Sequence, residues 1–378
     1  MPDCPTTNVP DEVNNTRIAV VCFSGTRGGM ELDALRMYYR LRSEFSSFLI
    51  CRKDSFLEKE LAGQKAFDRS YVALKFWDWL ALKFFSLGLA RQMRRALSQH
   101  KITDVIFFGT SEMRSIALAV KGSSIRVHLR QGTTVHKRKF GLLREFGYRA
   151  VTNYLATSEH IAKNIKSFFP NAKDSNTRLL YPVVEIPSQK MRAAGNLTNT
   201  VVIKYHSRFV RGKGQIDALH AFKALWDIEK NSELHFVGDF SDPLYVAALR
   251  KTTASLGLQS YCKIESHIND ISTFLSDGHI FLAPSYGEGF SNAFVEAMQA
   301  GLVCIVYLNT VFPEFQHQGF YFHAVETGDK EALAAKLIEV AQNLPQEIDK
   351  SASNVKLAYE NFSAKRESET LWKLFERH

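Results

Sequence analysis

The chain has 378 residues, a formal net charge of +9 and 45% hydrophobic residues. This length suits two domains of ordinary size, each of which buries its own hydrophobic core. With only 21 Gly and 10 Pro and with 23% charged residues, the composition excludes collagen-like, disordered and low-complexity proteins.

The positive charge is concentrated in the first half of the chain. Up to Lys190 there are 30 Lys and Arg against 17 Asp and Glu, a net charge of +13, and the remainder carries −4. A surplus of this size is typical of proteins that bind nucleic acid or an acidic membrane surface, and the alternative is a solvated basic face.

Targeting signals are not evident in the sequence. The first sixteen residues are polar, and no stretch reaches the roughly 18 apolar residues of a membrane-spanning helix. The five cysteines are scattered, without a CxxC pair, which favours reduced thiols in a cytoplasmic protein.

Short apolar runs alternate with helix-length segments, a pattern typical of βαβ units and a parallel sheet. In the first half the predicted strands are 17–23, 47–51, 104–108, 125–129, 155–157 and 178–181. In the second half they are 201–205, 233–237, 261–264, 279–283 and 302–306. The sequence therefore predicts an α/β protein with two doubly wound parallel sheets.

A Pro-, Gly- and Asn-containing stretch without periodicity, 182–200, separates the two halves. We therefore expect domains over 1–186 and 187–361. Two helices are expected in 346–378, and the last of them, about 362–378, is expected to pack back on the first domain.

The first predicted strand runs into a glycine loop that precedes a helix. Gly28 and Gly29 in this loop would let backbone amides approach an anion at the start of the helix. A plain tight turn is the alternative. The dinucleotide fingerprint GxGxxG is absent, and Arg52 and Lys53 follow the second strand where an NAD enzyme needs an acid.

A second loop, in YHSRFVRGKGQIDAL, carries Arg208 and Lys213 five residues apart, with glycines on both sides of the lysine. Two cations that converge at the start of a helix suit a diphosphate. Taken alone, the loop favours two exposed cations.

A third loop, in SYGEGFSNAFVEAM, places Glu288 before a predicted helix and Glu296 about two turns along it. A carboxylate at a turn can bind sugar hydroxyls, and one on the helix can hold ribose hydroxyls. Capping and solvated acids are the alternative. Backbone amides at the start of the helix are offered by Gly289, Phe290, Ser291 and Asn292.

An aromatic and basic segment, 71–97, contains too many large apolar residues for one narrow helical stripe. We expect a helix that is partly core and partly exposed, a combination that suits an anionic membrane interface; a wholly buried helix is the alternative. A second basic cluster begins at His136 and continues through Lys137, Arg138 and Lys139.

The segments GGMELDAL, SRFVRGKG, FVGDF, SHINDISTFL and PSYGEGFSNAFVEAMQAG resemble, in order and spacing, the retaining GT-B glycosyltransferases of family four. The resemblance implies two Rossmann-like domains that face each other across a cleft, with the acceptor bound by the first and the donor by the second. It assigns the Glu-x7-Glu motif to Glu288 and Glu296, and the diphosphate-binding pair to Arg208 and Lys213.

The resemblance also assigns donor contacts to Gly28 and Gly29. We expect the backbone near Ser266, His267 and Ile268 to contact the base, because HINDIS follows a strand beside the nucleotide pocket. Where many relatives carry a histidine after a cleft-facing strand, this chain has Arg130 or Gln131. His128 is expected to pack within the strand. The loop that follows offers further contacts to an acceptor or a phosphate, through Arg130, Thr133, Thr134 and His136.

No Asp-x-Asp occurs, so we expect no metal and no cofactor, with cations in place of the metal. The prediction is a retaining hexosyltransferase that uses a nucleotide-diphosphate sugar and an anionic glycan or lipid-linked acceptor, as in lipopolysaccharide biosynthesis, at the inner face of the cytoplasmic membrane. No nucleic-acid motif accompanies the charge. The alternatives are a GT-B sugar-nucleotide epimerase and a non-catalytic protein that binds membranes or nucleic acid.

Overall fold

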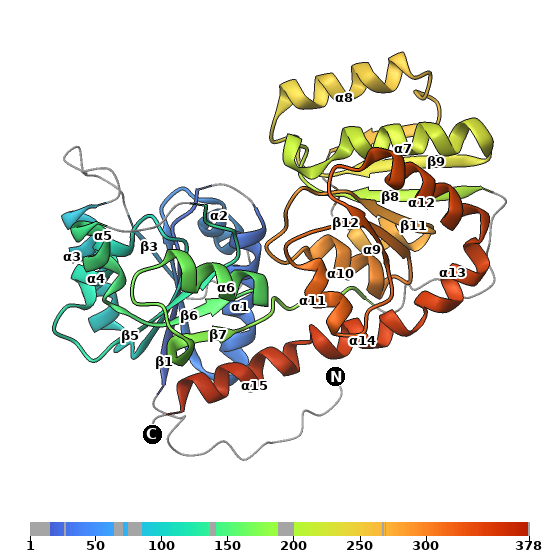
Figure 1. Ribbon diagram of the computed structural model, residues 1–378. Helices are drawn as coiled ribbons and strands as arrows, with labels where there is room; N and C mark the ends of the chain where they lie inside the picture. The colour runs from blue at the N-terminus through green and yellow to red at the C-terminus, as the bar shows by residue number, and fades with distance from the viewer. Residues whose placement is uncertain are drawn as a thin grey trace. The chain divides into compact units, whose positions relative to one another are not determined.

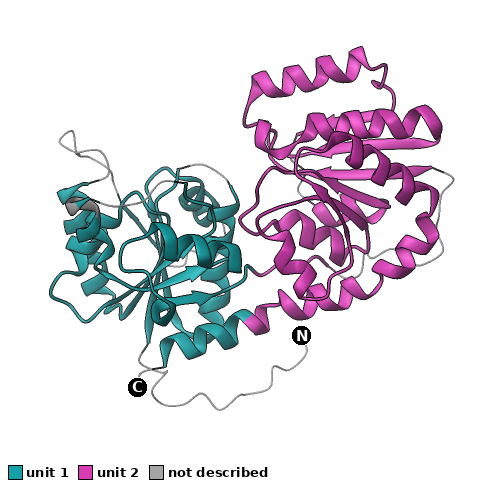
Figure 2. Ribbon diagram, viewed as in Figure 1, with its two compact units in different colours: residues 1–182, 367–378 teal, residues 183–366 magenta. Residues whose placement is uncertain are grey.

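The structure is a computed structural model that describes residues 16–25, 28–63, 71–74, 85–136, 141–187, 200–266, 268 and 270–376, without the side chains of 142–144. The chain divides into two compact units (Figure 2). Unit 1 comprises Met1–Pro182 and Glu367–His378, and unit 2 comprises Val183–Arg366. The chain therefore leaves unit 1 once and returns to it at the end.

Unit 1 is built on a seven-stranded parallel sheet with the order β3-β2-β1-β4-β5-β6-β7 (Figure 1). Its strands are β1 Arg17–Cys22, β2 Ser46–Arg52, β3 Tyr71–Leu74, β4 Asp104–Phe108, β5 Arg126–Gln131, β6 Val151–Ala156 and β7 Thr177–Leu179. Its helices are α1 Gly29–Glu44, α2 Phe56–Ala62, α3 Leu87–Gln99, α4 Met113–Val120, α5 Leu142–Tyr148 and α6 Glu159–Phe168, with the short 3-10 turn η2 Asp174–Asn176.

Both faces of this sheet are covered, which explains why its central strands read as continuous apolar runs. Along β1, Ile18 and Val20 belong to the core on one face, and Ala19 and Val21 belong to the core on the other. The first core also contains residues of the last helix, α15 Ala364–Phe375. The last helix, which we expected to pack back on the first domain, thus contributes Leu371 and Phe375 to this core of unit 1.

Unit 2 is built on a six-stranded parallel sheet with the order β10-β9-β8-β11-β12-β13. Its strands are β8 Val201–His206, β9 Ser232–Val237, β10 Cys262–Glu265, β11 Ile280–Ala283, β12 Val303–Leu308 and β13 His323–Glu326. Its helices are α7 Gln215–Ile228, α8 Pro243–Ser255, α9 Ile271–Ser276, α10 Asn292–Gln299, α11 Phe312–His317, α12 Lys330–Gln342, α13 Leu344–Ser351 and α14 Ser353–Asn361. Helices α7 and α12 pack together, and α10 packs against α14.

Helix α10 is anchored by a cluster of buried aromatic rings. Phe294 stacks on Phe315 with ring centroids 5.2 Å apart, and it meets Phe312 and Phe322 edge to face. Aromatic pairs in these geometries stabilise a core beyond the effect of buried area. The cluster fixes the helix that carries Glu296.

The two-sheet α/β prediction is confirmed, and three elements differ from it. Residues 71–97 do not form one helix, because Tyr71–Leu74 pairs with β2 as the edge strand β3 and α3 begins at Leu87. The edge strand β13 was not predicted, because its four residues carry only two apolar side chains. Three helices, not two, follow residue 343.

In the described ranges, no helix has the length and apolarity needed to cross a membrane.

Candidate functional site

In unit 2 the strand order reverses between β8 and β11, so the loops that follow these two strands lie side by side. Ligands of parallel α/β sheets bind at such a point, beyond the carboxyl ends of the strands. The two loops are joined by the amide of Tyr286, which donates to the carbonyl of Gly212 at 3.0 Å. Sequence prediction placed Arg208 and Lys213 on one loop and Glu288 on the other, and the structure brings these loops together.

The approach of the two loops depends on Gly214, which has a φ of +74°. A Cβ atom at this position would lie 2.0 Å from the carbonyl oxygen of Pro284. Both the left-handed backbone and the missing side chain therefore require glycine. The residue marks the start of α7 and fixes Lys213 beside the second loop.

Lys213 and Glu288 form an ion pair, with Nζ 2.6 Å from Oε1. Their side chains are 19% and 15% exposed, so the pair is largely shielded from solvent yet reachable. Burial raises the pKa of Tyr205 well above its usual value, and its hydroxyl donates to the Lys213 carbonyl. The amide of Glu288 donates to Thr310 Oγ1 at 3.0 Å, which fixes the acid from the other side.

Arg208 is exposed, and a buried glutamine holds the backbone of its loop. Gln215 Nε2 donates to the Arg208 carbonyl and to Ser207 Oγ, both at 2.9 Å. Tyr245 in turn donates to Gln215 Oε1 at 3.2 Å. The arginine thus stands on a fixed backbone with its guanidinium directed to solvent, where it can meet an anion.

Helix α10 begins at the same edge of the sheet. Its N-cap, Ser291, has the left-handed φ of +73° and makes no side-chain capping hydrogen bond. Phe290 is buried against Phe315 and Phe362, so only its backbone faces the loop. Asn292 starts the helix, and the amides of this first turn suit an anion.

Glu296 lies about one turn along α10, not the two turns expected, and is 8% exposed. Its Oε2 lies 3.5 Å from His206 Nδ1 at the end of β8. Ile268 follows β10, the edge strand, which β9 separates from β8. His267 lies outside the described residues.

The predicted site residues of unit 1 lie at the carboxyl ends of β1 and β5. Gly28 is the extended N-cap of α1, and a Cβ there would lie 2.9 Å from the buried carboxylate of Glu31. Gly29 has no atom near its missing Cβ. The loop residues Thr26 and Arg27 lie outside the described residues.

Arg130 is 3% exposed, and its guanidinium is bonded to Asp33 Oδ2 at 3.0 and 3.1 Å and to the Leu180 carbonyl. These contacts favour a structural role over binding of a phosphate. Thr133 accepts from Gln131 Nε2 through its carbonyl and its hydroxyl.

Thr134 Oγ1 lies 3.0 Å from His160 Nε2. Burial, together with the charge of Lys163, lowers the pKa of His160 and keeps this imidazole neutral near pH 7. His136 is exposed, and Lys137, Arg138 and Lys139 lie outside the described residues. A neutral, half-buried histidine thus borders the loop where sequence analysis expected an acceptor.

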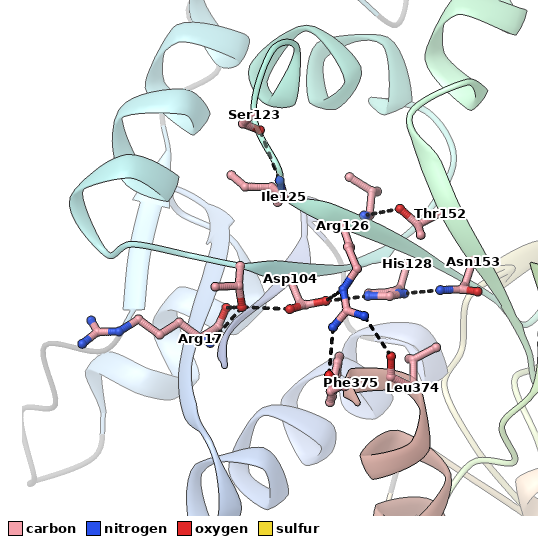
Figure 3. Close-up of polar contacts among 12 residues, drawn as sticks. Arg17, Asp104, Ser123, Ile125, Arg126, His128, Thr152, Asn153, Leu374 and Phe375 are labelled. Carbon is pink, nitrogen blue, oxygen red and sulfur yellow. Dashed lines mark hydrogen bonds and ion pairs between the residues drawn. The ribbon is translucent and has the colours of Figure 1, made fainter. Parts of the chain in front are cut away.

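Buried within the sheet, His128 packs inside its strand as expected (Figure 3). Its Nε2 lies 2.9 Å from Asp104 Oδ1, and its Nδ1 lies 3.1 Å from the Asn153 amide nitrogen. Because Asn153 can only donate through nitrogen, this places the proton of a neutral imidazole on Nε2. Burial, opposed by Asp104, lowers the pKa of His128, so the group is structural.

Among the residues that the structure describes, no group of three or more His, Cys, Asp or Glu could hold a metal ion. At the carboxyl edge of the unit 2 sheet, Glu288 is paired with a cation, Lys213.

Residues 200–343 match the family described as glycosyl transferases group 1. The predicted resemblance to a glycosyltransferase family is confirmed over these residues. No curated protein sequence matches the chain.

Solved glycosyltransferases share the fold of the whole chain. Anabaena Alr3699/HepE, solved in complex with UDP-glucose, has a TM-score of 0.78 at 16% identity, over 95% of this chain and 99% of that chain. A glycosyltransferase from Rickettsia africae has a TM-score of 0.78 at 17% identity, over 96% and 98% of the two chains. The lipopolysaccharide outer core galactosyltransferase WaaB has a TM-score of 0.64 at 16% identity, over 92% and 99%. The fold is GT-B.

In this glycosyltransferase fold, several residues that shape the site were not found from the sequence. Gln215, Thr310 and His206 touch the predicted residues from neighbouring elements, and His160 does so in unit 1. His206 and Gln215 lie within the segment YHSRFVRGKGQIDAL, so their place beside Arg208 and Gly214 was an available signal. Thr310 and His160 stand in none of the motifs that the sequence analysis singled out.

Proposed function

We propose that this chain is a retaining, metal-independent glycosyltransferase. In this proposal it moves a hexose-type sugar from a nucleotide-diphosphate sugar to an anionic glycan or glycolipid. The observation that carries the proposal is the Lys213–Glu288 ion pair, on the loop that also carries Arg208, where the strand order of unit 2 reverses. A single edge of one sheet there presents two cations, a carboxylate and the start of a helix.

In this function Arg208 and Lys213 neutralise the charge that develops on the departing diphosphate. One well-placed donor of this kind contributes about 3 to 4 kcal/mol to the lowering of a barrier. The amides from Gly289 to Asn292, which lead into α10, add a fixed positive potential. These groups take the part that a metal has in other transferases, and the chain needs no cofactor.

The two glutamates have separate tasks. Glu288, held by Thr310 and Lys213, positions the hydroxyls of the transferred sugar. Glu296, on α10, accepts hydrogen bonds from the ribose. The base of the nucleotide lies against the backbone near His267 and Ile268, and Gly28 and Gly29 contribute donor contacts from unit 1.

Transfer proceeds by attack of an acceptor hydroxyl from the face that the diphosphate leaves. The oxygen–hydrogen bond of the acceptor breaks as the new glycosidic bond forms, and the leaving phosphate oxygen takes the proton. No protein nucleophile is required. Thr133, Thr134 and His136 of unit 1 contact the acceptor. Arg130 donates to Asp33 and thereby holds the strand end from which this loop starts.

An anionic, lipid-linked acceptor is supported by the basic surface of unit 1. On α3, Arg91, Arg94 and Arg95 are exposed, and Leu87 at its start is 53% exposed. This face suits contact with acidic lipid through the segment 71–97, of which 75–84 lies outside the described residues. The likeness to WaaB, named for the lipopolysaccharide outer core, supports cell-surface glycan synthesis at the inner face of the cytoplasmic membrane.

The first experiment is a thermal-shift screen with UDP, GDP and ADP, in which the likeness to HepE with bound UDP-glucose favours UDP. Turnover is then measured with the matching nucleotide sugars. Arg208→Gln, Lys213→Gln and Glu288→Gln should each lower turnover at least tenfold and leave the far-UV spectrum unchanged.

The matched control is Lys223→Gln, which removes a lysine–aspartate pair on the surface of α7. It should keep wild-type turnover. Near wild-type transfer by all three site variants would overturn the assignment. Product analysis with the donor alone separates the transferase from an epimerase, because an epimerase converts its nucleotide sugar without an acceptor.

A further inference from the structure

His206 and Glu296 face each other across the carboxyl edge of the unit 2 sheet. His206 is the last residue of β8, and Glu296 lies on α10, the helix that follows β11. The imidazole Nδ1 lies 3.5 Å from the carboxylate Oε2, and the side chains are 26% and 10% exposed.

This pair differs from the closed ion pair in the same unit. Lys213 Nζ and Glu288 Oε1 are 2.6 Å apart and form a hydrogen bond, whereas the 3.5 Å between His206 Nδ1 and Glu296 Oε2 exceeds the usual 2.7–3.2 Å. Both facing atoms, His206 Nδ1 and Glu296 Oε2, are buried, and neither has a hydrogen-bond partner in the part of the chain that the structure describes.

Buried polar atoms without partners are uncommon, because each forfeits its hydration. Here two such atoms point at each other and need to move less than 1 Å to form a hydrogen bond. Because Glu296 Oε2 is buried and faces the imidazole, the other carboxylate oxygen is the one that can accept from a ligand. The arrangement therefore sets the direction of Glu296.

We propose that His206 is a positioning residue for the nucleotide: it holds Glu296 Oε2, so that Oε1 accepts from a ribose hydroxyl and the site distinguishes ribose from deoxyribose. The inference rests on the proposed function, in which Glu296 binds ribose. Binding of the ribose excludes water from the carboxylate, and the hydrogen bond from His206 compensates for that loss.

The test measures dissociation constants of UDP and 2′-deoxy-UDP by isothermal titration calorimetry. The proteins are the wild type, His206→Leu, His206→Asn, Glu296→Gln and the double variant His206→Leu with Glu296→Gln. Asparagine places an amide nitrogen close to the position of Nδ1, whereas leucine removes the donor. His220→Leu, at an exposed histidine on α7, is the matched control.

We expect His206→Leu to weaken UDP binding about fivefold to tenfold and 2′-deoxy-UDP binding less than twofold. The ratio of the two dissociation constants, which measures the preference for UDP over 2′-deoxy-UDP, should therefore fall toward the ratio for Glu296→Gln. His206→Asn should restore most of this preference. In the Glu296→Gln background, His206→Leu should cause no further loss of UDP binding.

Each outcome decides a different point. Three results would overturn the role of His206 and leave the proposed function standing. His206→Leu could weaken the binding of UDP and of 2′-deoxy-UDP equally, or it could weaken neither. Alternatively, His206→Asn could fail to restore the preference for UDP over 2′-deoxy-UDP. If the wild type binds neither nucleotide, nor GDP or ADP, the proposed function fails and the inference falls with it. His220→Leu should match the wild type throughout.

Discussion

Glu367 is a carboxylic acid in the interior of unit 1, 4% exposed, on the helix that ends the chain. Its Oε2 lies 2.6 Å from Arg40 on α1, and Asp33 and Arg130 lie in its electrostatic neighbourhood. Burial raises its pKa to about 7, against the attraction of Arg40. The residue thus changes charge close to neutral pH.

This pKa gives a signed prediction for Glu367→Gln. In the unfolded chain the acid titrates near 4.5, so between pH 4.5 and 7 the folded protein binds more protons. The free energy of unfolding of the wild type therefore falls by up to roughly 3 kcal/mol as pH rises through this window. Glutamine does not titrate, so the variant should gain stability relative to the wild type from pH 4.5 to pH 7.5.

Urea unfolding at pH 4.5, 6 and 7.5 measures this difference. Glu360→Gln, at an exposed acid on α14, is the control and should show no such trend. A stability difference between Glu367→Gln and the wild type that stays constant across the three pH values would contradict the prediction.

The site residues divide into those that the sequence could predict and those that it could not. Arg208, Lys213 and Glu288 stand in loops between an apolar strand and an amphipathic helix, so local pattern and spacing indicate an anion site. Gln215 acts through the backbone of the loop that precedes its own helix, and Thr310 acts through the backbone of another loop. The Thr310 contact depends on strand order, which a single sequence does not reveal.

At the level of elements, the junction of β8 and α7 depends on one glycine. Gly214→Ala should destabilise unit 2 by about 2 kcal/mol or more, because alanine disfavours the left-handed backbone and its Cβ would overlap the Pro284 carbonyl. Gly212→Ala is the matched control, since no atom lies within 4 Å of its missing Cβ.

Thermal unfolding should therefore show a loss of several degrees for Gly214→Ala and at most a small change for Gly212→Ala. Equal melting temperatures of the two variants would mean that the loops separate freely. A loss of nucleotide binding in Gly214→Ala alone would follow from the displaced Lys213.

The last turn of α15 is held by one arginine of the unit 1 sheet (Figure 3). Arg126 donates to the carbonyls of Leu374 and Phe375 at 3.3 and 3.1 Å, and its Nε lies 2.7 Å from Asp104 Oδ1. Burial alone would raise the pKa of Asp104, but the hydrogen bonds from His128 and Arg126 and the charge of Arg126 lower it. The buried carboxylate is therefore charged and orients the arginine.

Arg126→Met should destabilise unit 1 by about 2 to 3 kcal/mol, because Asp104 loses its charged partner and two helix-end carbonyls lose their donor. Hydrogen exchange should quicken first in residues 371–375. Arg17→Met, at an exposed arginine whose side chain donates to the His100 carbonyl, serves for comparison and should leave this exchange unchanged. Unaltered protection of α15 in Arg126→Met would refute the role of the arginine.

Element boundaries show where the sequence was informative. Central strands such as β1 and β4 were predicted closely, because burial on both faces demands continuous apolar residues. The edge strands β3 and β13 have one neighbour each and carry a weaker pattern. Their identity comes from pairing with β2 and β12, which local sequence does not encode.

For the whole molecule, the +13 of the first half and the −4 of the second predict salt-dependent binding to anionic vesicles. The chain should sediment with vesicles that contain phosphatidylglycerol and not with pure phosphatidylcholine, and about 0.5 M salt should release it. A triple variant, Arg91→Gln with Arg94→Gln and Arg95→Gln, should weaken this binding. Equal binding to both vesicle types would contradict an electrostatic surface.

The return of the chain to unit 1 at Glu367 affects the order in which the protein is made. Leu371 and Phe375 complete a core whose other members, such as Ile18 and Val20, leave the ribosome more than 300 residues earlier. Unit 1 is thus synthesised first and completed last, after every residue of unit 2. A chain released before Glu367 therefore contains every residue of unit 2, while the core of unit 1 lacks Leu371 and Phe375, a state that a chaperone would have to shield.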